Sequence, residues 1–353
     1  MLDHKKIAQE IIRRTGGLRQ REQSVRRFFV PALQKLFAGL QVGDFIGSQY
    51  CVIAEGSSFS SLKNKSVEEY LVWGVDGSQV YPDPQLFGGD TAIINVGGIQ
   101  LLYEKDNGFA DLFITTEFIV QEEFCNQAPN LVFGPEIIDC IRFLREIECG
   151  VGRFLQKPGA LFGFLLFDGS MVPQGLMLKN AAVQQFVMKK YVELLKIIRE
   201  KSIPVCWYTS SPRSLLWATA VEFSEGTDVD LLSQSMSQGE ISPVLGYKKN
   251  ELFGHELSGL DMPVFVYLKM GEDVVKLEFP LWIFEHKDLF ERLFFSLSDQ
   301  VKKGFGYPVA LTEAHMHVVV TENDRQLIFA LAEQEKGYNS TKNKNFRKKI
   351  IPV

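Results

Sequence analysis

The sequence has 353 residues, of which 46% are hydrophobic and 23% are charged. This composition is typical of a folded globular protein and excludes a disordered, collagen-like or coiled-coil chain, while the length allows one large domain or two smaller ones. The formal net charge of −5 argues against a nucleic-acid partner, since such proteins usually carry a basic surface.

The charge is unevenly distributed along the chain. Residues 1–27 carry a net charge of +5 and residues 336–353 carry +6, whereas residues 28–335 carry −16. An acidic body with two basic ends fits a carboxylate metal site with cationic extensions, and it also fits two solvated tails. Composition alone favours the solvated tails.

Cysteine usage and hydropathy indicate a cytoplasmic protein. The five cysteines lack C-x-x-C spacing, which favours reduced thiols over a disulfide framework or a zinc ribbon. The longest apolar run, residues 160–167, is far shorter than the roughly 20 residues that span a bilayer. The amino terminus also lacks the apolar region of a signal peptide. We therefore expect no membrane partner.

Taken in chain order, hydrophobic periodicity predicts alternating helices and strands. Apolar residues recur at helical spacing over residues 4–40, within a helical arm of residues 1–66. The remaining predicted elements are a strand over residues 70–75, a β-rich meander or hairpin within 80–135, a helix from Pro135, a strand over 160–167, a helix over 180–200, a strand over 203–207, strands from 264 and 274, and a helix over 287–303.

This alternation predicts an α/β fold with a mixed β-sheet flanked by helices. We expect one domain over residues 1–353, with a core over residues 67–335. The segments 80–135 and 221–261 are predicted as insertions, and residues 336–353 as a basic tail.

Two predicted strands end in the same tripeptide, Asp-Gly-Ser, at residues 76–78 and 168–170. A single Asp-Gly is a common turn signal, so one copy would suggest only a loop. Two copies after apolar strands favour another interpretation, because a carboxylate at the end of a buried strand is held rigidly and glycine allows close approach. Asp76 and Asp168 on adjacent strands could share hard divalent cations, which prefer oxygen ligands.

The helix from Pro135 supplies a third candidate acid. Its apolar stripe includes Ile141 and Leu144, and Glu148 falls on the same stripe. We therefore expect Glu148 to face the core, where a carboxylate is costly unless it is paired with an arginine or bound to metal. Glu146 lies off this stripe and is expected at the solvent side or the helix flank, as the second choice.

The sequence GYPVALTEAH, beginning at Gly306, supplies the last candidates. If Pro308 opens a helix, His315 and Val318 share a face that packs on the core. A histidine on an apolar face is more often a satisfied core residue than a metal ligand, and both interpretations stay open at this point. Tyr307 comes just before the helix, where its hydroxyl could reach a phosphate or its ring could pack.

VDGS at residues 75–78, FDGS at residues 167–170, the helix between them and GYPVALTEAH occur in an order that resembles the NurA-type DNA repair nucleases. The resemblance runs from about residue 70 to 320. It implies an RNase H-like core and a manganese-dependent nuclease, with magnesium as the alternative cation. It also implies 5′ to 3′ exonuclease and single-strand endonuclease activity, a homodimer, and a HerA-type hexameric helicase or translocase partner in DNA end resection.

The resemblance also implies a set of site residues. Asp76 and Asp168 match the family's strand-end aspartates, Glu148 its helical glutamate, and Tyr307 and His315 its tyrosine and histidine. These five residues are the predicted catalytic set. The two aspartates, Glu148 and His315 are the predicted metal ligands in a two-metal mechanism, and Tyr307 is expected to orient the scissile phosphate.

One segment departs from the family pattern. Where the family often carries a lysine after the third strand, this sequence reads WYTSSPRS over residues 207–214. Ser211 followed by Pro212 suits a helix amino terminus, whose amides together with Arg213 could bind a phosphate of DNA. An ordinary helix cap explains the same pattern.

Two other functions fit parts of the sequence. One is a catalytically silent RNase H-like scaffold that binds DNA or a translocase, and the complete set of acids and histidine argues against it. The other is a metal-dependent phosphohydrolase acting on a small molecule. The absence of a glycine-rich phosphate cradle argues against this second alternative.

Overall fold

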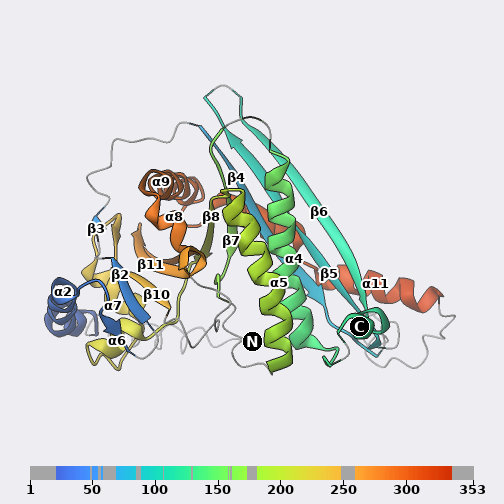
Figure 1. Cartoon of the computed structure of the whole chain (residues 1–353), viewed down its shortest axis with the longest axis horizontal. Helices are drawn as coiled ribbons and strands as arrows, with labels where there is room; N and C mark the ends of the chain where they lie inside the picture. The colour runs from blue at the N-terminus through green and yellow to red at the C-terminus, as the bar shows by residue number, and fades with distance from the viewer. Residues whose placement is uncertain are drawn as a thin grey trace, which may run out of the picture.

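A mixed β-sheet runs through the molecule and carries helices on both faces (Figure 1). The computed structural model describes residues 21–47, 50–54, 57–58, 69–84, 89–105, 107–128, 130–157, 159, 161–172, 181–247 and 259–335. Over these residues the predicted mixed α/β class is confirmed. Residues 1–20 of the predicted arm and the basic tail 336–353 lie outside the described residues.

The sheet order in the described residues is β1-β2-β10-β11-β12-β8-β7-β4-β5-β6, and β9 pairs with both β11 and β3. The strands are β1 (Phe45–Ile46), β2 (Tyr50–Ala54), β3 (Ser57–Ser58), β4 (Tyr70–Val80), β5 (Thr91–Tyr103), β6 (Phe109–Val120), β7 (Gly163–Asp168), β8 (Val205–Thr209), β9 (Glu240–Ile241), β10 (Val244–Tyr247), β11 (Pro263–Met270) and β12 (Asp273–Pro280). Among them, β4, β7 and β8 run parallel to one another.

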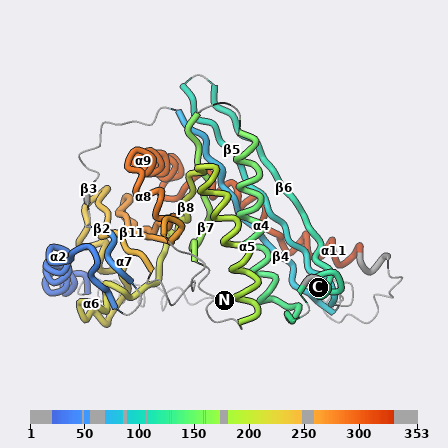
Figure 2. The backbone as a smooth tube through the Cα atoms, viewed as in Figure 1, coloured from blue at the N-terminus to red at the C-terminus, as the bar shows by residue number. Residues whose placement is uncertain are grey.

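The described helices pack around this sheet. They are η1 (Val25–Phe29), α2 (Val30–Gly39), α3 (Gln121–Gln127), α4 (Pro135–Leu155), α5 (Ala181–Glu200), α6 (Leu216–Ala220), α7 (Asp228–Ser235), η5 (Gly259–Asp261), α8 (Leu281–Glu285), α9 (Lys287–Lys303), α10 (Val309–Val318) and α11 (Glu322–Glu335). The tube view shows α2, in blue, beside α6 and α7, in yellow, although they are far apart in sequence (Figure 2).

Two apolar strands form the centre of the sheet. Every residue from Tyr70 to Val75 in β4 and from Gly163 to Phe167 in β7 is buried. Parallel strands covered on both faces have nearly continuous apolar sequences, which is why the sequence predicts both of them. β4 is longer than predicted, because its antiparallel pairing with β5 continues through residues 76–78 to Val80.

Helices approach both faces of β4 at residues that lack a side chain. On one face, a Cβ atom at Gly74 would lie 2.1 Å from the backbone oxygen of Ala310 in α10. On the other face, a Cβ atom at Gly77 would lie 2.6 Å from an oxygen of Glu146 in α4. Since side chains alternate between the faces of a strand, Asp76 points to the α10 side.

The segments at the two ends of the sheet extend it. β5 and β6, within the region predicted as insertion 80–135, form a meander with β4. Residues 221–261 contribute α7, β9, β10 and η5, and β10 joins β2 to the sheet. The apolar run VVKLEFPLWIF, which predicts the strand from residue 274, is strand only to Pro280, and its last four residues instead begin α8.

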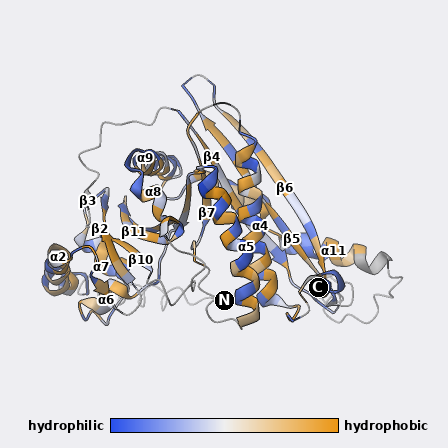
Figure 3. Ribbon diagram, viewed as in Figure 1, coloured by the Kyte–Doolittle hydropathy of each residue, from blue (hydrophilic) through white to orange (hydrophobic). Residues whose placement is uncertain are grey.

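Apolar side chains fill two main regions. The larger core lies between the central strands and the helices α4, α5 and α9, and Figure 3 shows hydrophobic residues along these strands and helices. The second lies between the sheet and the helices α2, α6 and α7, and it includes Leu33, Trp217, Leu231 and Phe265. The five cysteines are free thiols. None of the described helices is both long and apolar enough to cross a membrane.

Candidate acidic site at the ends of β4 and β7

The fold places Asp76 and Asp168 next to each other. The parallel register joins Val75 to Phe167, so the two aspartates occupy the next positions on neighbouring strands. Each carboxylate accepts a hydrogen bond from the following glycine amide, at 2.7 Å from Gly77 and at 3.0 Å from Gly169. These local bonds fix both carboxylates at the carboxyl end of the central strand pair.

Residues from α10 and from the turn before it contact the two aspartates. The Nδ1–H of His315 donates to Oδ2 of Asp76 at 2.8 Å. The hydroxyl of Tyr307 is hydrogen-bonded to Asp168, and its ring lies edge-on to Tyr208, with centroids 5.4 Å apart. The structure therefore brings together four of the five residues predicted as catalytic.

The expectation that His315 faces the core is wrong. Its side chain is 66% exposed, whereas Leu311 and Val318 of the same helix are buried. Ala314 takes the buried position in this turn, and His315 lies on the helix flank, from which it reaches the end of β4.

The expectation that Glu148 faces the core is also wrong, and Glu146 takes that place. Glu146 is 8% exposed, whereas the Glu148 side chain is 36% exposed and bonds Nη1 of Arg145 at 2.6 Å. The reason is that α4 packs against both the sheet and α5, so its buried face is wider than one stripe. The row of Arg142, Glu146 and Gly150, spaced by four, faces β4.

Gly77 and Arg142 hold Glu146 at the strand end. A side chain at residue 77 would collide with the Glu146 carboxylate. Nη1 of Arg142 forms an ion pair with Glu146 and also donates to the Gly77 carbonyl oxygen at 3.1 Å. Gly77 therefore allows the Glu146 carboxylate to lie close to β4. It is not a turn residue, because β4 continues through it.

Burial and neighbouring carboxylates raise the pKa of Glu146 and of Asp168. Burial raises the pKa of Glu146 to about 7; Arg142 opposes this shift, and Asp76 and Asp168 add to it. Desolvation raises the pKa of Asp168; the Tyr307 hydrogen bond opposes the shift and Asp76 adds to it. Burial and the charge of Asp168 raise the pKa of Tyr307, so its hydroxyl stays protonated and can donate a hydrogen bond. Mutual repulsion of this kind favours a bound cation.

The donors at this site fit a hard divalent cation. Carboxylate oxygens suit magnesium and manganese, and an imidazole nitrogen favours manganese. In the part of the chain that the structure describes, no three His, Cys, Asp or Glu side chains form a ready-made metal cluster. Asp76 is hydrogen-bonded to His315 and Glu146 is paired with Arg142. The fit to a divalent cation therefore rests on the carboxylate oxygens, the imidazole nitrogen and the negative charge of the site.

Glu146→Gln should change the pH dependence of stability when a chelator is present. The raised pKa means that folding takes up a proton between the ordinary value of 4.5 and about 7. Wild-type stability should therefore fall by roughly 3 kcal/mol as the pH rises through this interval, and that of Glu146→Gln should not. Denaturant unfolding from pH 4 to 8 measures the difference, and a difference that does not change with pH would contradict the assignment.

A buried ion pair supports the loop after Asp168. Glu278 is fully buried and accepts hydrogen bonds from Ser170 Oγ and the Met171 amide, both at 2.5 Å. Its other oxygen accepts from the Tyr247 hydroxyl at 3.0 Å and pairs with Lys276. Sequence reasoning missed this network, although two charges at alternate positions of the apolar run VVKLEFP are a signal for it.

The predicted phosphate cradle at Ser211 and Arg213 does not form. The helix begins at Leu216, after Pro212, and it has only five residues. Its first amides donate to the buried carboxylate of Asp228, from Leu216 at 3.1 Å and from Ala218 at 2.9 Å. A protein carboxylate thus occupies the place predicted for a phosphate. Ser211 and Arg213 are exposed in the loop after β8.

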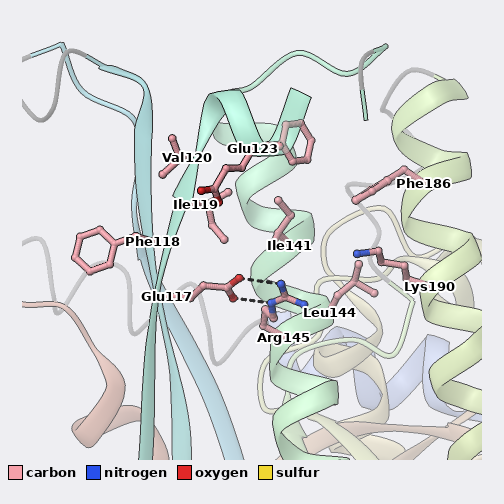
Figure 4. Close-up of a pocket in the computed structure, with 11 residues that line it drawn as sticks. Glu117, Phe118, Ile119, Val120, Glu123, Ile141, Leu144, Arg145, Phe186 and Lys190 are labelled. Atoms are coloured by element: carbon pink, nitrogen blue, oxygen red, sulfur yellow. Dashed lines mark hydrogen bonds and ion pairs between the residues drawn. The ribbon is translucent and has the colours of Figure 1, made fainter. Parts of the chain in front are cut away.

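Arg145 and Glu148 belong to a different cluster, beside a cavity of about 90 Å³ between β6, α4 and α5 (Figure 4). Arg145 donates to both oxygens of Glu117, at 2.6 and 2.9 Å, in addition to Glu148. These contacts raise the pKa of Arg145, with Glu117 as the largest cause. The arginine salt bridge, one of the two alternatives for Glu148, is the one that the structure contains.

The geometry defines a mixed α/β protein with an acidic site where the parallel pairing of two adjacent strands ends. Residues 157–320 match the family model of the NurA domain. This segment of 164 residues is similar to the NurA domain. The matched span contains Asp168, Tyr307 and His315, and it leaves out Asp76 and Glu146 on β4 and α4.

The solved structures that match the chain include three of NurA. A crystal structure of NurA with manganese shares 11% identity, covers 92% of this chain and 98% of its own, and has a TM-score of 0.44. A crystal structure of NurA, at 11% identity, covers 94% and 98%, with a TM-score of 0.43. A third, of NurA bound to dAMP and manganese, at 11% identity, covers 92% and 96%, with a TM-score of 0.41. No curated protein matches the chain.

Proposed function

We propose that this protein is a metal-dependent DNA nuclease that hydrolyses phosphodiester bonds. The observation that carries the proposal is the pairing of Asp76 and Asp168 on adjacent strands, with Glu146 reaching the same strand end. The NurA domain match supports a nuclease over a binding scaffold. The identity of the catalytic residues is part of the proposal, with Glu146 in the place first predicted for Glu148.

The site would hold manganese, or magnesium, through Asp76, Asp168 and Glu146. His315 donates its Nδ1–H to Asp76, which leaves Nε2 as the nitrogen that could serve as a ligand. A bound divalent cation would polarise the phosphate and lower the pKa of a water nucleophile, and the two-cation form of this chemistry is part of the proposal.

The protein's own groups position the reacting phosphate. Tyr307 keeps its proton because of burial and the charge of Asp168, so its hydroxyl is a neutral donor for a phosphate oxygen. Arg142 forms an ion pair with the Glu146 carboxylate and also donates a hydrogen bond to the Gly77 carbonyl oxygen of β4. Ser170, held by Glu278, fixes the loop that follows Asp168. Together these groups fix the site before the substrate binds, which is the condition for efficient electrostatic catalysis.

The finer features of the proposal come from the family resemblance. They are 5′ to 3′ exonuclease and single-strand endonuclease activity, a homodimer, and a HerA-type hexameric translocase partner in double-strand break end resection. An RNase H-like core belongs with them, whereas the cytoplasmic location is proposed from the cysteine usage and hydropathy of the sequence. The basic segments 1–27 and 336–353 are the candidate phosphate contacts, since neutralising backbone phosphates gives salt-sensitive DNA binding.

Cleavage assays with manganese on linear duplex DNA, single-stranded DNA and free nucleotides test the proposal. We expect cleavage of DNA, and loss of that cleavage in a chelator. Tight DNA binding without cleavage of any substrate would favour the silent scaffold. Hydrolysis of the nucleotides alone would favour a small-molecule phosphohydrolase.

The two glutamates of α4 provide a matched pair of variants. Glu146→Gln should lower DNA cleavage by about 100-fold or more, beyond the 10- to 100-fold effect of groups that only support a metal site. Glu148→Gln should retain cleavage within about twofold, because Glu148 pairs with Arg145 at a partly exposed position. Initial rates at saturating manganese measure both. Equal losses in the two variants, or a loss only in Glu148→Gln, would overturn the assignment.

A further inference from the structure

The turn between α9 and α10 presents a fully exposed aromatic side chain. Phe305 is 98% exposed and has a φ of +55°, a backbone conformation that a bulky residue adopts only at a cost. Strained residues of this kind persist where the surroundings fix them, and they cluster at functional sites.

The surroundings of this turn are rigid. The Gly306 amide donates to the Val301 carbonyl oxygen at 2.9 Å, and the Tyr307 amide donates to that of Gly304. A Cβ atom at Gly304 would lie 1.9 Å from the carbonyl oxygen of Tyr307. The same hydrogen-bonded turn therefore places the Phe305 side chain in solvent and the Tyr307 side chain beside Asp168.

A hollow of about 330 Å³ adjoins this turn. Leu268, Phe294 and Val301 contribute apolar walls, and Lys302, Gly271 and Gly306 contribute to its lining as well. Lys302 is exposed. The hollow thus combines apolar surface with a cation. Phe305 does not line it, but lies between the end of α9 and Gly306, which does.

The hollow lies at the same edge of the sheet as the acidic site. β12 runs antiparallel to β8, so the turn between β11 and β12 lies at the carboxyl end of β8. At that end Tyr208 pairs with Asp168. Gly306 lines the hollow, and the next residue, Tyr307, bonds Asp168. The hollow and the candidate catalytic carboxylates are therefore neighbours.

An exposed ring, an apolar hollow and a lysine are the chemistry that binds unpaired nucleobases. Every base offers a π-face that stacks on an aromatic side chain, and a cation near the stack neutralises the phosphate. We propose that Phe305 and the hollow form a nucleobase subsite, which holds the unpaired strand on one side of the phosphate to be cleaved. The proposal rests on the proposed nuclease function and gives that site a preference for single-stranded or frayed DNA.

Binding of a fluorescent single-stranded oligonucleotide in a chelator tests the subsite without cleavage. Phe305→Ala should weaken binding by about tenfold, the usual effect of losing one stacked base, and Phe305→Trp should restore it. Phe109→Ala is the matched control, because Phe109 is 42% exposed and lies towards the opposite end of β4. It should bind like the wild type.

Two further measurements assign the effect to a base. A single abasic position, moved along the oligonucleotide, should weaken wild-type binding about tenfold at one place and should not weaken Phe305→Ala further there. With manganese, Phe305→Ala should raise the KM for oligonucleotides, and this rise should be absent for an oligonucleotide that is abasic at the position that stacks.

The outcomes separate the subsite from the nuclease function. If the wild type cleaves DNA and Phe305→Ala binds and cleaves like it, the subsite is overturned and the nuclease stands. If Phe305→Trp fails to restore binding, or the abasic effect adds to that of Phe305→Ala, stacking is overturned. If the wild type cleaves no DNA, the nuclease proposal fails, and the binding measurements still decide whether Phe305 stacks on a base.

Discussion

Asp168→Asn and Asp76→Asn are each expected to lower manganese-supported DNA cleavage by more than about 100-fold, beyond the 10- to 100-fold typical of residues that only support a metal site. Both carboxylates lie where the parallel pairing of β4 with β7 ends, and each substitution removes the charge while keeping the shape of the side chain. Asn can still accept the hydrogen bonds from Gly77 and Gly169, so the backbone should not change. Single-turnover cleavage of a labelled oligonucleotide measures the effect.

The stability of these variants provides the control. Each substitution removes a charge that raises the pKa of Glu146, so the metal-free variants should unfold at the same temperature as the wild type or at a higher one. Asp111→Asn, at an exposed position of β6, should cleave like the wild type. Full cleavage by either site variant at saturating manganese would refute the role of the paired aspartates.

Lys276→Met is expected to destabilise the protein by about 3–5 kcal/mol, the typical cost of leaving a buried charge without its partner. Burial alone would raise the pKa of Glu278, but Lys276, Ser170 and Tyr247 together hold it below its usual value. Glu278 therefore contributes stability above its ordinary pKa of 4.5, and this contribution is lost as the pH falls. Denaturant unfolding at pH 7 and pH 4 measures both effects.

The double variant Lys276→Met with Glu278→Leu separates the ion pair from simple packing. Replacing a buried pair by apolar residues of similar size is often neutral or stabilising, so the double variant should recover most of the lost stability. It should still cleave DNA more slowly, because Ser170 and the Met171 amide lose their acceptor beside Asp168. A double variant as unstable as Lys276→Met would contradict this interpretation.

The parts of the fold that the sequence predicts are those governed by local patterns. The continuous apolar runs of β4 and β7 and the Asp-Gly-Ser after each are sufficient to predict adjacent aspartates. The helix from Pro135 to Leu155 and that from Lys287 to Lys303 follow from periodicity in the same way. In each case the residues that decide the structure are close together in the chain.

The errors concern contacts between distant segments. The sheet and α5 cover α4 from two sides, so its buried face is wider than one apolar stripe. A prediction from a single stripe therefore places Glu148 in the core instead of Glu146. The helix terminus after Ser211 is satisfied by Asp228, a partner 12 residues beyond Leu216. The network around Glu278 requires β12 to pair with β8, and no local pattern specifies that pairing.

Because β4 continues beyond Asp76, the backbones of the two aspartates are held in different ways. The Asp76 backbone has ladder partners on β5 before and after it, up to Val80. Asp168 is the last residue of β7 and is followed by Gly169 with a φ of +88°. A cation that enters between them would meet one carboxylate held by strand pairing on both sides and one held through the loop that Ser170 and Glu278 anchor, so substitutions in that loop should displace Asp168 and leave Asp76 in place.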